Sequence, residues 1–323
     1  MLVLVVVPWG TAHAQEEEHE SFVMHHVKDD YEWSFAKIGA THIRLPLPIL
    51  TYEPRSGFKA FSSSRLRSSS GQIAAYRGYT LTPKGELVSV DNSFSFYNFS
   101  ITKNVISLWI SAAVLLAGVL WGSSRYDDKG WRVPRRGRAL LEMLVCFVRD
   151  KIALPNIGHK QYKRFTPYLL TVFFFIWLNN LLGLLPGAAN VTGNISVALV
   201  LALFTFFITV FNGNKHYWGH VFSTPGVPRW LSPIMIPIEL VGLLTKPFAL
   251  MVRLFANITA GHIILLSIVG LIFTLQTVWA SAVSVPFGAF MLLLKLLVAF
   301  LQAYIFTLLS AIYIGAAVEE HTS

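Results

Sequence analysis

Residues 246–266 read KPFALMVRLFANITAGHIILL, and Arg253 lies near the middle of this otherwise largely apolar stretch. A cation at membrane depth costs several kcal/mol unless something offsets it, and such residues are usually functional. An arginine can also extend its guanidinium to the lipid headgroups, but the apolar sequence on both sides disfavours that explanation. The stretch therefore predicts a membrane-spanning helix with a functional cation.

The composition is that of a membrane protein. Hydrophobic residues make up 54% of the chain and charged residues 13%, with a mean hydropathy of +0.55. Soluble domains carry about 25% charged residues. The net charge of +9 does not indicate nucleic-acid binding, because many cations lie between apolar segments, where they act as topology signals. The single cysteine, Cys146, excludes an internal disulfide and any cysteine-based zinc site.

The N-terminus resembles a secretory signal peptide. Its apolar run is too short to cross a bilayer and ends in Ala12-His13-Ala14, an A-x-A-like cleavage site. No basic region precedes the run, so an uncleaved apolar end is the alternative. We expect a signal peptide over residues 1–14, a periplasmic segment over residues 15–103, partly β or disordered, and a membrane domain over residues 104–323.

Short strands bounded by Gly, Pro and Ser are predicted in the periplasmic segment. They are HIRLPLPILTY (42–52), GFKAFSS (57–63) and AYRGYTLT (75–82). Three histidines near the N-terminus, His19, His25 and His26, could bind a metal ion. Exposed histidines near a terminus are more often solvated, so we expect no metal site there.

Five apolar segments predict five crossings: 104–124, 165–186, 194–212, 233–275 and 283–318. The last two are much longer than the ~20 residues that a crossing needs, which indicates broken or strongly tilted helices. The basic loop after the first segment is cytoplasmic by the positive-inside rule. This places the N-terminus outside and the C-terminus inside. Residues 139–153 have helical spacing but are too short to span, so we expect them along the inner interface.

Small and polar residues share the helical face of Arg253. This face holds Glu239, Gly242, Lys246, Ala249, Asn257, Ala260 and Ser267. Small residues allow close approach of another helix, which favours a partner helix that brings an acid to Arg253. Ordinary packing within the chain is the alternative, but it leaves the central cation unexplained.

Other intramembrane polar residues have two possible roles. His262 points away from the face of Arg253, whereas Lys295, Ala299, Gln302 and Tyr313 line one stripe of the last helix. Asn179 and Asn180 could line water or bond a neighbouring helix. A lone glutamine in a membrane helix is often only an interhelical contact.

Several motifs together resemble subunit a of F-type ATP synthases over roughly residues 104–323. They are LLTKPFALMVRLFANITAGH, LLVAFLQAYIFTLLSAIYIGAAVEEH, WLNNLLGLLPG and PIELV. The expected fold is an all-α membrane protein with five membrane-crossing helices, the last two a long tilted hairpin. An interfacial amphipathic helix and a small β-like outer segment complete it.

The resemblance implies a non-catalytic, proton-conducting stator subunit with two offset half-channels. Its implied partners are a c-subunit ring, the b-subunit peripheral stalk and the remainder of the synthase, in a bacterial inner membrane. ATP chemistry would lie on partner subunits, and we expect no cofactor, metal or nucleic acid. The alternatives are a secondary transporter whose Arg253 binds an anionic substrate, and a structural scaffold.

The resemblance also assigns residues. Arg253 matches the family's essential arginine, and Asn257, Glu239 and Gln302 match its supporting polar positions. His262 and Lys295 stand where the family often has an acid and a histidine, so both candidates here are bases. Gly183 stands where the family often has an acid. Proton relay through His262 or Lys295 is the weakest of these assignments.

Overall fold

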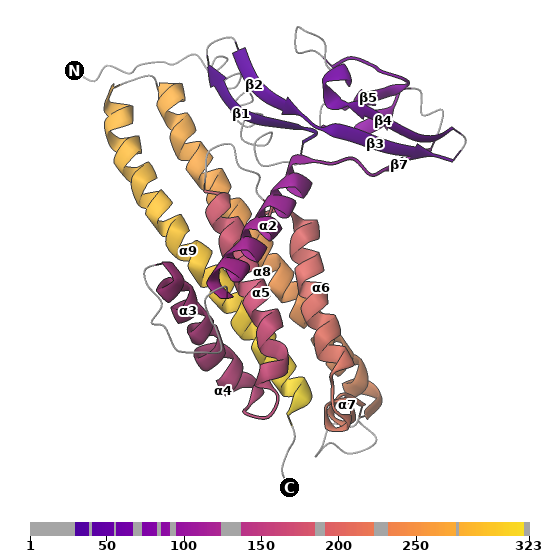
Figure 1. The fold of residues 1–323 in the computed structure, drawn as a ribbon, viewed down its shortest axis with the longest axis vertical. Helices are drawn as coiled ribbons and strands as arrows, with labels where there is room; N and C mark the ends of the chain where they lie inside the picture. Colours follow the sequence, from indigo (N-terminus) through magenta and orange to yellow (C-terminus); the bar gives the residue numbers. More distant parts are fainter. Residues whose placement is uncertain are drawn as a thin grey trace, which may run out of the picture. The chain divides into compact units, whose positions relative to one another are not determined.

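The computed structural model describes residues 30–38, 41–54, 56–66, 73–82, 85–90, 95–123, 137–184, 191–222, 232–275 and 278–319. Short strands come first along the chain and helices follow (Figure 1). The chain forms two compact units. The first comprises residues 1–110, 182–191 and 262–292, and the second comprises residues 111–181, 192–261 and 293–323. The predicted signal peptide and the three N-terminal histidines lie outside the described residues.

Antiparallel strand pairs make up the N-terminal part of the first unit. β1 (Glu32–Ile38) pairs with β2 (Thr41–Pro46), and β5 (Tyr79–Leu81) pairs with β6 (Leu87–Ser89). A three-stranded sheet has β3 (Pro48–Glu53) between β4 (Gly57–Ser62) and β7 (Tyr97–Asn98). A short 3-10 helix, η1 (Ser63–Leu66), follows β4. Each predicted stretch contains a strand: residues 42–52 are divided between β2 and β3, residues 57–63 contain β4, and residues 75–82 contain β5.

One face of β3 packs into a small hydrophobic core. Burial alternates along β3, as expected for a strand with one covered face, so Ile49, Thr51 and Glu53 point inward. Ile49, Leu66 and Tyr79 are fully buried and belong to the same cluster.

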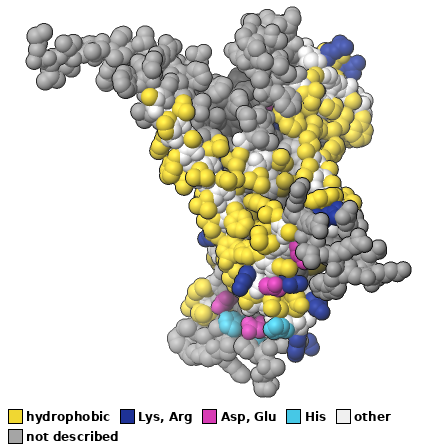
Figure 2. Space-filling model, turned by 60° about the vertical axis from the view of Figure 1, so that its left-hand side comes forward, with side chains coloured by type: hydrophobic (Ala, Val, Ile, Leu, Met, Phe, Trp, Pro, Cys, Tyr) yellow, Lys and Arg dark blue, Asp and Glu magenta, His cyan; other side chains and the backbone are white. Residues whose placement is uncertain are grey.

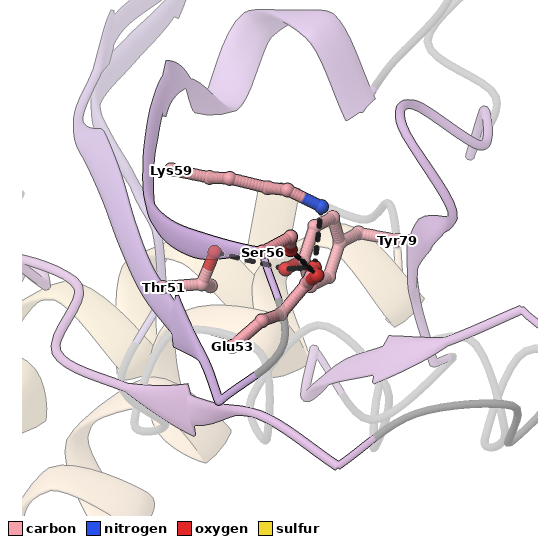
Figure 3. A network of polar contacts seen from close by, with 5 residues as sticks. All are labelled: Thr51, Glu53, Ser56, Lys59 and Tyr79. Atoms are coloured by element: carbon pink, nitrogen blue, oxygen red, sulfur yellow. Dashed lines mark hydrogen bonds and ion pairs between the residues drawn. The ribbon is translucent and has the colours of Figure 1, made fainter.

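A carboxylate is buried beside this core and satisfied by its neighbours (Figure 3). Glu53 accepts hydrogen bonds from Ser56 and from the Tyr79 hydroxyl, and its Oε1 lies 2.6 Å from Lys59 Nζ. Thr51 donates to the Tyr79 hydroxyl at 3.0 Å. These bonds, that from Lys59 first, lower the pKa of Glu53 to about 2.

Helices make up the rest of the described chain. They are α2 (Lys103–Ser123), α3 (Gly137–Phe147), α4 (Leu154–Ile157), α5 (Tyr162–Leu182), α6 (Ile195–Phe211), α7 (Lys215–Phe222), α8 (Ser232–Leu275) and α9 (Val278–Val318). A π-helical turn, η2 (Val148–Ala153), joins α3 to α4. The predicted helical segment 139–153 is therefore helical throughout, although its second half is π-helical.

Four described helices contain a stretch that is long and apolar enough to cross a membrane: α2, α5, α8 and α9. The number becomes five when α6 and α7, which are bent by 102° relative to each other, count as one crossing. The predicted all-α, multi-pass membrane fold is confirmed.

The last two helices are unusually long. α8 has 44 residues and α9 has 41, and neither is interrupted, although Pro237, Pro247 and Pro286 lie inside them. At 1.5 Å per residue, 44 residues extend about 66 Å, roughly twice the ~30 Å of a hydrocarbon core. The continuous helices exclude the first predicted explanation for this length, a break, and the second, a strong tilt, stays a prediction.

The second unit has a continuous hydrophobic core. Fully buried side chains from three helices meet there, among them Phe173 of α5, Leu254 of α8 and Phe306 of α9. Hydrophobic side chains also cover much of the surface visible in Figure 2, and the visible histidine side chains lie near its lower edge. A largely apolar exterior is what a lipid-facing protein requires, because lipid tails offer polar groups no hydrogen bonds.

Candidate functional site

Arg253 lies on the uncovered face of α8. Leu250, Met251 and Leu254 point into the bundle and are at most 6% exposed, whereas Arg253, Ala249 and Ala260 are exposed. Within the described residues, no hydrogen bond or ion pair to Arg253 is formed. The guanidinium is therefore not enclosed by its own chain and is open to a partner.

Lys246, two turns before Arg253, is placed differently. Its Nζ lies 5.5 Å from the centre of the Tyr313 ring on α9, within the range of a cation–π contact. Among the described residues, Lys246 thus has an internal cation–π contact and Arg253 has none.

Asn257 and Gln302 join the two long helices next to Arg253. Asn257 Nδ2 donates to Gln302 Oε1 at 3.1 Å, and Gln302 is only 3% exposed. Asn257 follows Arg253 by four residues, about one helical turn. Residues i and i+4 lie on the same helical face, so the amide pair borders the arginine.

A second polar connection leads from this pair toward the end of α5. Asn180 donates from Nδ2 to the Ala299 carbonyl at 3.3 Å, and its Oδ1 accepts from Thr192 Oγ1 at 2.7 Å. Ala299 precedes Gln302 by three residues and so lies on the same side of α9. Asn179 Oδ1 is buried and has no hydrogen-bond partner among the described residues.

Thr192 was missed by the sequence reasoning. It lies in the turn before α6, a predicted outer loop, where a threonine attracts no notice. The WLNN motif drew attention to Asn180, but the spacing along one chain gives no information about which turn residue meets it.

Lys295 lies against α8. A Cβ at Gly261 would fall 3.3 Å from Lys295 Cε, so glycine makes room for this side chain. Lys295 Nζ is buried and forms no hydrogen bond within the described parts of the chain. Unpaired amines are costly in an apolar interior, which makes Lys295 an unusual feature of the site.

Glu239 is not brought to this cluster. It is half-buried on α8, fourteen residues before Arg253, or about 21 Å along the helix axis. His262 lies on α8 in the first unit, and its side chain lies outside the described residues. The structure therefore joins Asn257 to Gln302 one helical turn from Arg253, brings Lys295 to Gly261, and leaves Glu239 apart.

No group of three or more His, Cys, Asp or Glu side chains that could hold a metal ion occurs in the described ranges. The exposed arginine and the buried amides offer hydrogen bonds and charge, without a nucleophile–base pair. Such a set can hold a carboxylate, order water or guide a proton.

These features define a multi-pass α-helical membrane protein whose two long final helices carry an exposed arginine beside a hydrogen-bonded pair of amides. A family model described as ATP synthase A chain matches residues 105–315. A second model, described as a domain of unknown function, matches residues 22–105.

Similar proteins carry the name ATP synthase subunit a. The protein from Anaeromyxobacter dehalogenans (strain 2CP-C) is 49% identical over 236 residues, which cover 71% of this chain and 60% of the relative. The protein from Myxococcus xanthus (strain DK1622) is 49% identical over 228 residues, which cover 68% of this chain and 74% of the relative. ATP synthase subunit a 2 of Chlorobium luteolum (strain DSM 273 / BCRC 81028 / 2530) is 42% identical over 318 residues, which cover 95% of this chain and 79% of the relative. The chain belongs to the ATP synthase A chain family.

Proposed function

We propose that this chain is the proton-translocating stator subunit of a rotary F-type ATP synthase. Its partners are a c-subunit ring, the b-subunit stalk and the remaining subunits, in a bacterial inner membrane. ATP chemistry takes place on those partner subunits, and this chain performs none. The observation that carries the proposal is an exposed arginine on a membrane helix that forms no hydrogen bond or ion pair with any described residue.

Arg253 is suited to meet a carboxylate that belongs to the ring. A carboxylate facing lipid must be protonated, because a bare charge there is costly. About 4 Å from the guanidinium, at an effective dielectric constant of ~20, the attraction is roughly 4 kcal/mol. This lowers the carboxyl pKa by about three units at 1.36 kcal/mol each. The ring carboxyl therefore releases its proton as it reaches Arg253.

The arginine also separates the two sides of the membrane. A guanidinium does not deprotonate in proteins, so Arg253 cannot itself pass protons from one half-channel to the other. A ring carboxyl that has released its proton on one side must turn with the ring to gain another. A potential of 100 mV adds about 2.3 kcal/mol per charge that crosses, which biases this rotation in one direction.

We assign the outer half-channel to Thr192 and Asn180, which reach the Ala299 carbonyl, and to the pair of Gln302 and Asn257 about one helical turn farther along α9. It begins at the turn before α6, which the charge pattern places on the outer side, and it ends one helical turn from Arg253. Hydroxyl and amide groups both donate and accept hydrogen bonds, so they can order a file of water molecules. Gly183 supplies no acid here, and the path depends on neutral groups.

We assign the basic residues Lys295 and His262 to this outer route. Lys295 lies against α8 at Gly261, and its Nζ is buried. Glu239, on the cytoplasmic side by the same topology, serves the inner half-channel. Its separation of about 21 Å from Arg253 agrees with a group on a different route.

Arg253→Ala is the direct test, with ATP-driven proton pumping measured in membrane vesicles. We expect pumping to be lost while the subunit stays in the membrane. Arg149→Ala is the matched control, because Arg149 is also exposed but is paired with Asp150 at 2.6 Å outside the predicted crossings. Normal pumping by the Arg253 variant would refute the mechanism and would favour a scaffold.

The alternative is a secondary transporter, which would work without a ring subunit. The isolated chain in liposomes would then take up an anionic substrate without any ring subunit, and Arg253→Ala would abolish that uptake. A cysteine at Ala249 or Ala260, which lie on the exposed face of α8, should instead cross-link to a small membrane subunit in the assembled complex.

A further inference from the structure

The three-stranded sheet β4–β3–β7 has one bare face that is aromatic. Its other face is covered, since Ile49, Thr51 and Glu53 of β3 are buried. An antiparallel sheet with one uncovered face normally carries polar side chains there. Here Phe58, Tyr52 and Tyr97 are directly opposed across the three strands, and opposed residues point to the same side.

These rings form a continuous surface, which we call the aromatic ladder: Tyr52, Phe58, Tyr97 and Phe99. The Tyr52 ring lies 4.8 Å from Phe58 and 6.5 Å from Tyr97 between centroids. Phe58 is 76% exposed, Tyr97 62% and Phe99 61%. Large exposed apolar patches mark interaction sites for proteins or membranes.

The aromatic ladder is tied to the start of a membrane helix. β7 leads directly into α2 (Figure 1), and the four residues between them, Phe99 to Thr102, extend at most about 14 Å. Backbone hydrogen bonds hold this connection: Phe99 N to Leu50 O at 2.9 Å, Ile101 N to Pro48 O at 3.2 Å and Lys103 N to Asp30 O at 3.1 Å. The sheet therefore cannot swing freely away from the beginning of α2.

Because the sheet is tied to the start of a membrane-crossing helix, the bilayer is a large apolar surface within its reach. Below the headgroups of one leaflet, whose polar region is about 5–8 Å thick, the hydrocarbon core begins. Tyrosine is enriched at this boundary because its ring is apolar and its hydroxyl can reach polar groups. The aromatic ladder has this composition, with two tyrosines between two phenylalanines.

We propose that the aromatic ladder rests in the polar–apolar interface of the leaflet that α2 enters first. Residues 30–100 are then a lipid-binding platform that fixes the direction of α2 in the membrane. The ligand is the headgroup and upper acyl region of phospholipids. The proposal depends on α2 crossing the membrane, and it is independent of Arg253 and of proton transfer.

The single native cysteine makes a depth measurement practical. In a Cys146→Ser background, Phe58→Cys or Tyr97→Cys is labelled with an environment-sensitive fluorophore, in the complex reconstituted into phospholipid vesicles. Glu86→Cys is the matched control, because Glu86 is exposed at the β5–β6 turn of the same segment. We expect a blue-shifted emission at positions 58 and 97, and several-fold stronger quenching by nitroxide lipids than at position 86.

Two results would overturn the proposal. Quenching by aqueous iodide at positions 58 and 97, equal to that at position 86, would mean that the ladder faces water. Protection from both quenchers would mean that another protein covers it.

A label at Ala60, beside the ladder, provides a second measurement. Phe58→Thr combined with Tyr97→Thr keeps strand propensity and removes the aromatic rings, so the Ala60 label should lose its lipid quenching. ATP-driven pumping of the same vesicles reports the proposed function separately, so each proposal can fail alone.

Discussion

At the scale of single residues, the amide pair beside Arg253 has a measurable interaction. Leucine at either Asn257 or Gln302 leaves the other amide unpaired, so the double variant Asn257→Leu/Gln302→Leu should be more stable than the sum of the single effects predicts. We expect a coupling of about 0.6–2 kcal/mol in the free energy of unfolding, the range for hydrogen bonds between membrane helices. Unfolding by detergent titration would measure it.

The control for this double-mutant cycle combines Asn257→Leu with Thr307→Val. Thr307 donates to the Ala303 carbonyl of its own helix at 2.8 Å and is not bonded to Asn257. These two changes should be additive. Additivity of the Asn257 and Gln302 changes as well would show that their hydrogen bond contributes nothing.

Glu53 predicts an acid sensitivity of the N-terminal sheet. Its pKa is about 2 in the folded chain against an ordinary value of 4.5, chiefly because of the bond from Lys59. Since the folded pKa is the lower one, the stabilisation is fully present above about pH 4.5 and is lost as the pH falls toward 2. The protection of residues 30–100 in the full chain against hydrogen exchange, relative to the unfolded chain at the same pH, should therefore decrease as the pH falls from about 4.5 toward 2.

Glu53→Gln should remove this pH dependence and weaken the sheet at neutral pH, because Lys59 loses its anionic partner. Glu86→Gln, at the exposed β5–β6 turn, should behave like the unchanged chain. If the Glu53 variant keeps the same acid transition, other titrating groups cause that transition.

Single residues could be predicted from the sequence only in part. Arg253, Asn257 and Gln302 were identifiable because charge and amides are rare in apolar helices. Their partners were not, since the register between two helices depends on packing that one sequence does not display. The contacts of Asn180 with Thr192 and of Lys295 with Gly261 are of this kind.

At the scale of elements, α9 passes very close to α4 at Gly315. A Cβ there would fall on the Asn156 carbonyl oxygen, which belongs to backbone and cannot move aside easily. Gly315→Ala should destabilise the chain by about 1–3 kcal/mol, as overpacking does. Gly288→Ala in the same helix meets nothing within 4 Å and should be neutral or slightly stabilising, because alanine favours helices.

Thermal unfolding of the two variants in the same detergent would measure this difference. Equal melting temperatures would show that α4 moves to accommodate a methyl group at position 315, and that the close approach of α9 to α4 is not required.

The elements themselves were largely predictable because their signals are local. Apolar length indicated the membrane helices, and Gly, Pro and Ser delimited the strands. The π-helical turn η2 was not predictable, because residues 148–153 have ordinary helical spacing. Pro237 and Pro247 do not interrupt α8, since bundled membrane helices tolerate proline where other groups satisfy the freed carbonyls.

At the scale of the whole molecule, the proposed lipid platform and the proposed outer half-channel share one requirement. Both need α2 to cross the membrane, so that its two ends lie on opposite sides. The sheet lies before α2, and the positive-inside rule predicts a cytoplasmic position for the basic loop that follows α2. The aromatic ladder and the turn at Thr192 then belong to the outer side, where protons enter the proposed outer half-channel. One orientation of the chain serves both proposals.

This orientation predicts the sidedness of two exposed positions. Cysteine at Glu86, before α2, and cysteine at Lys160, between α4 and α5, are introduced separately into the Cys146→Ser background. A membrane-impermeant thiol reagent should label position 86 in intact cells stripped of their outer membrane, and position 160 only in inverted vesicles. Labelling of both positions from one side would mean that α2 does not cross, and the lipid platform and the outer half-channel would both have to be abandoned. Reversed sidedness would instead leave the platform in place and exchange the assignments of the two half-channels.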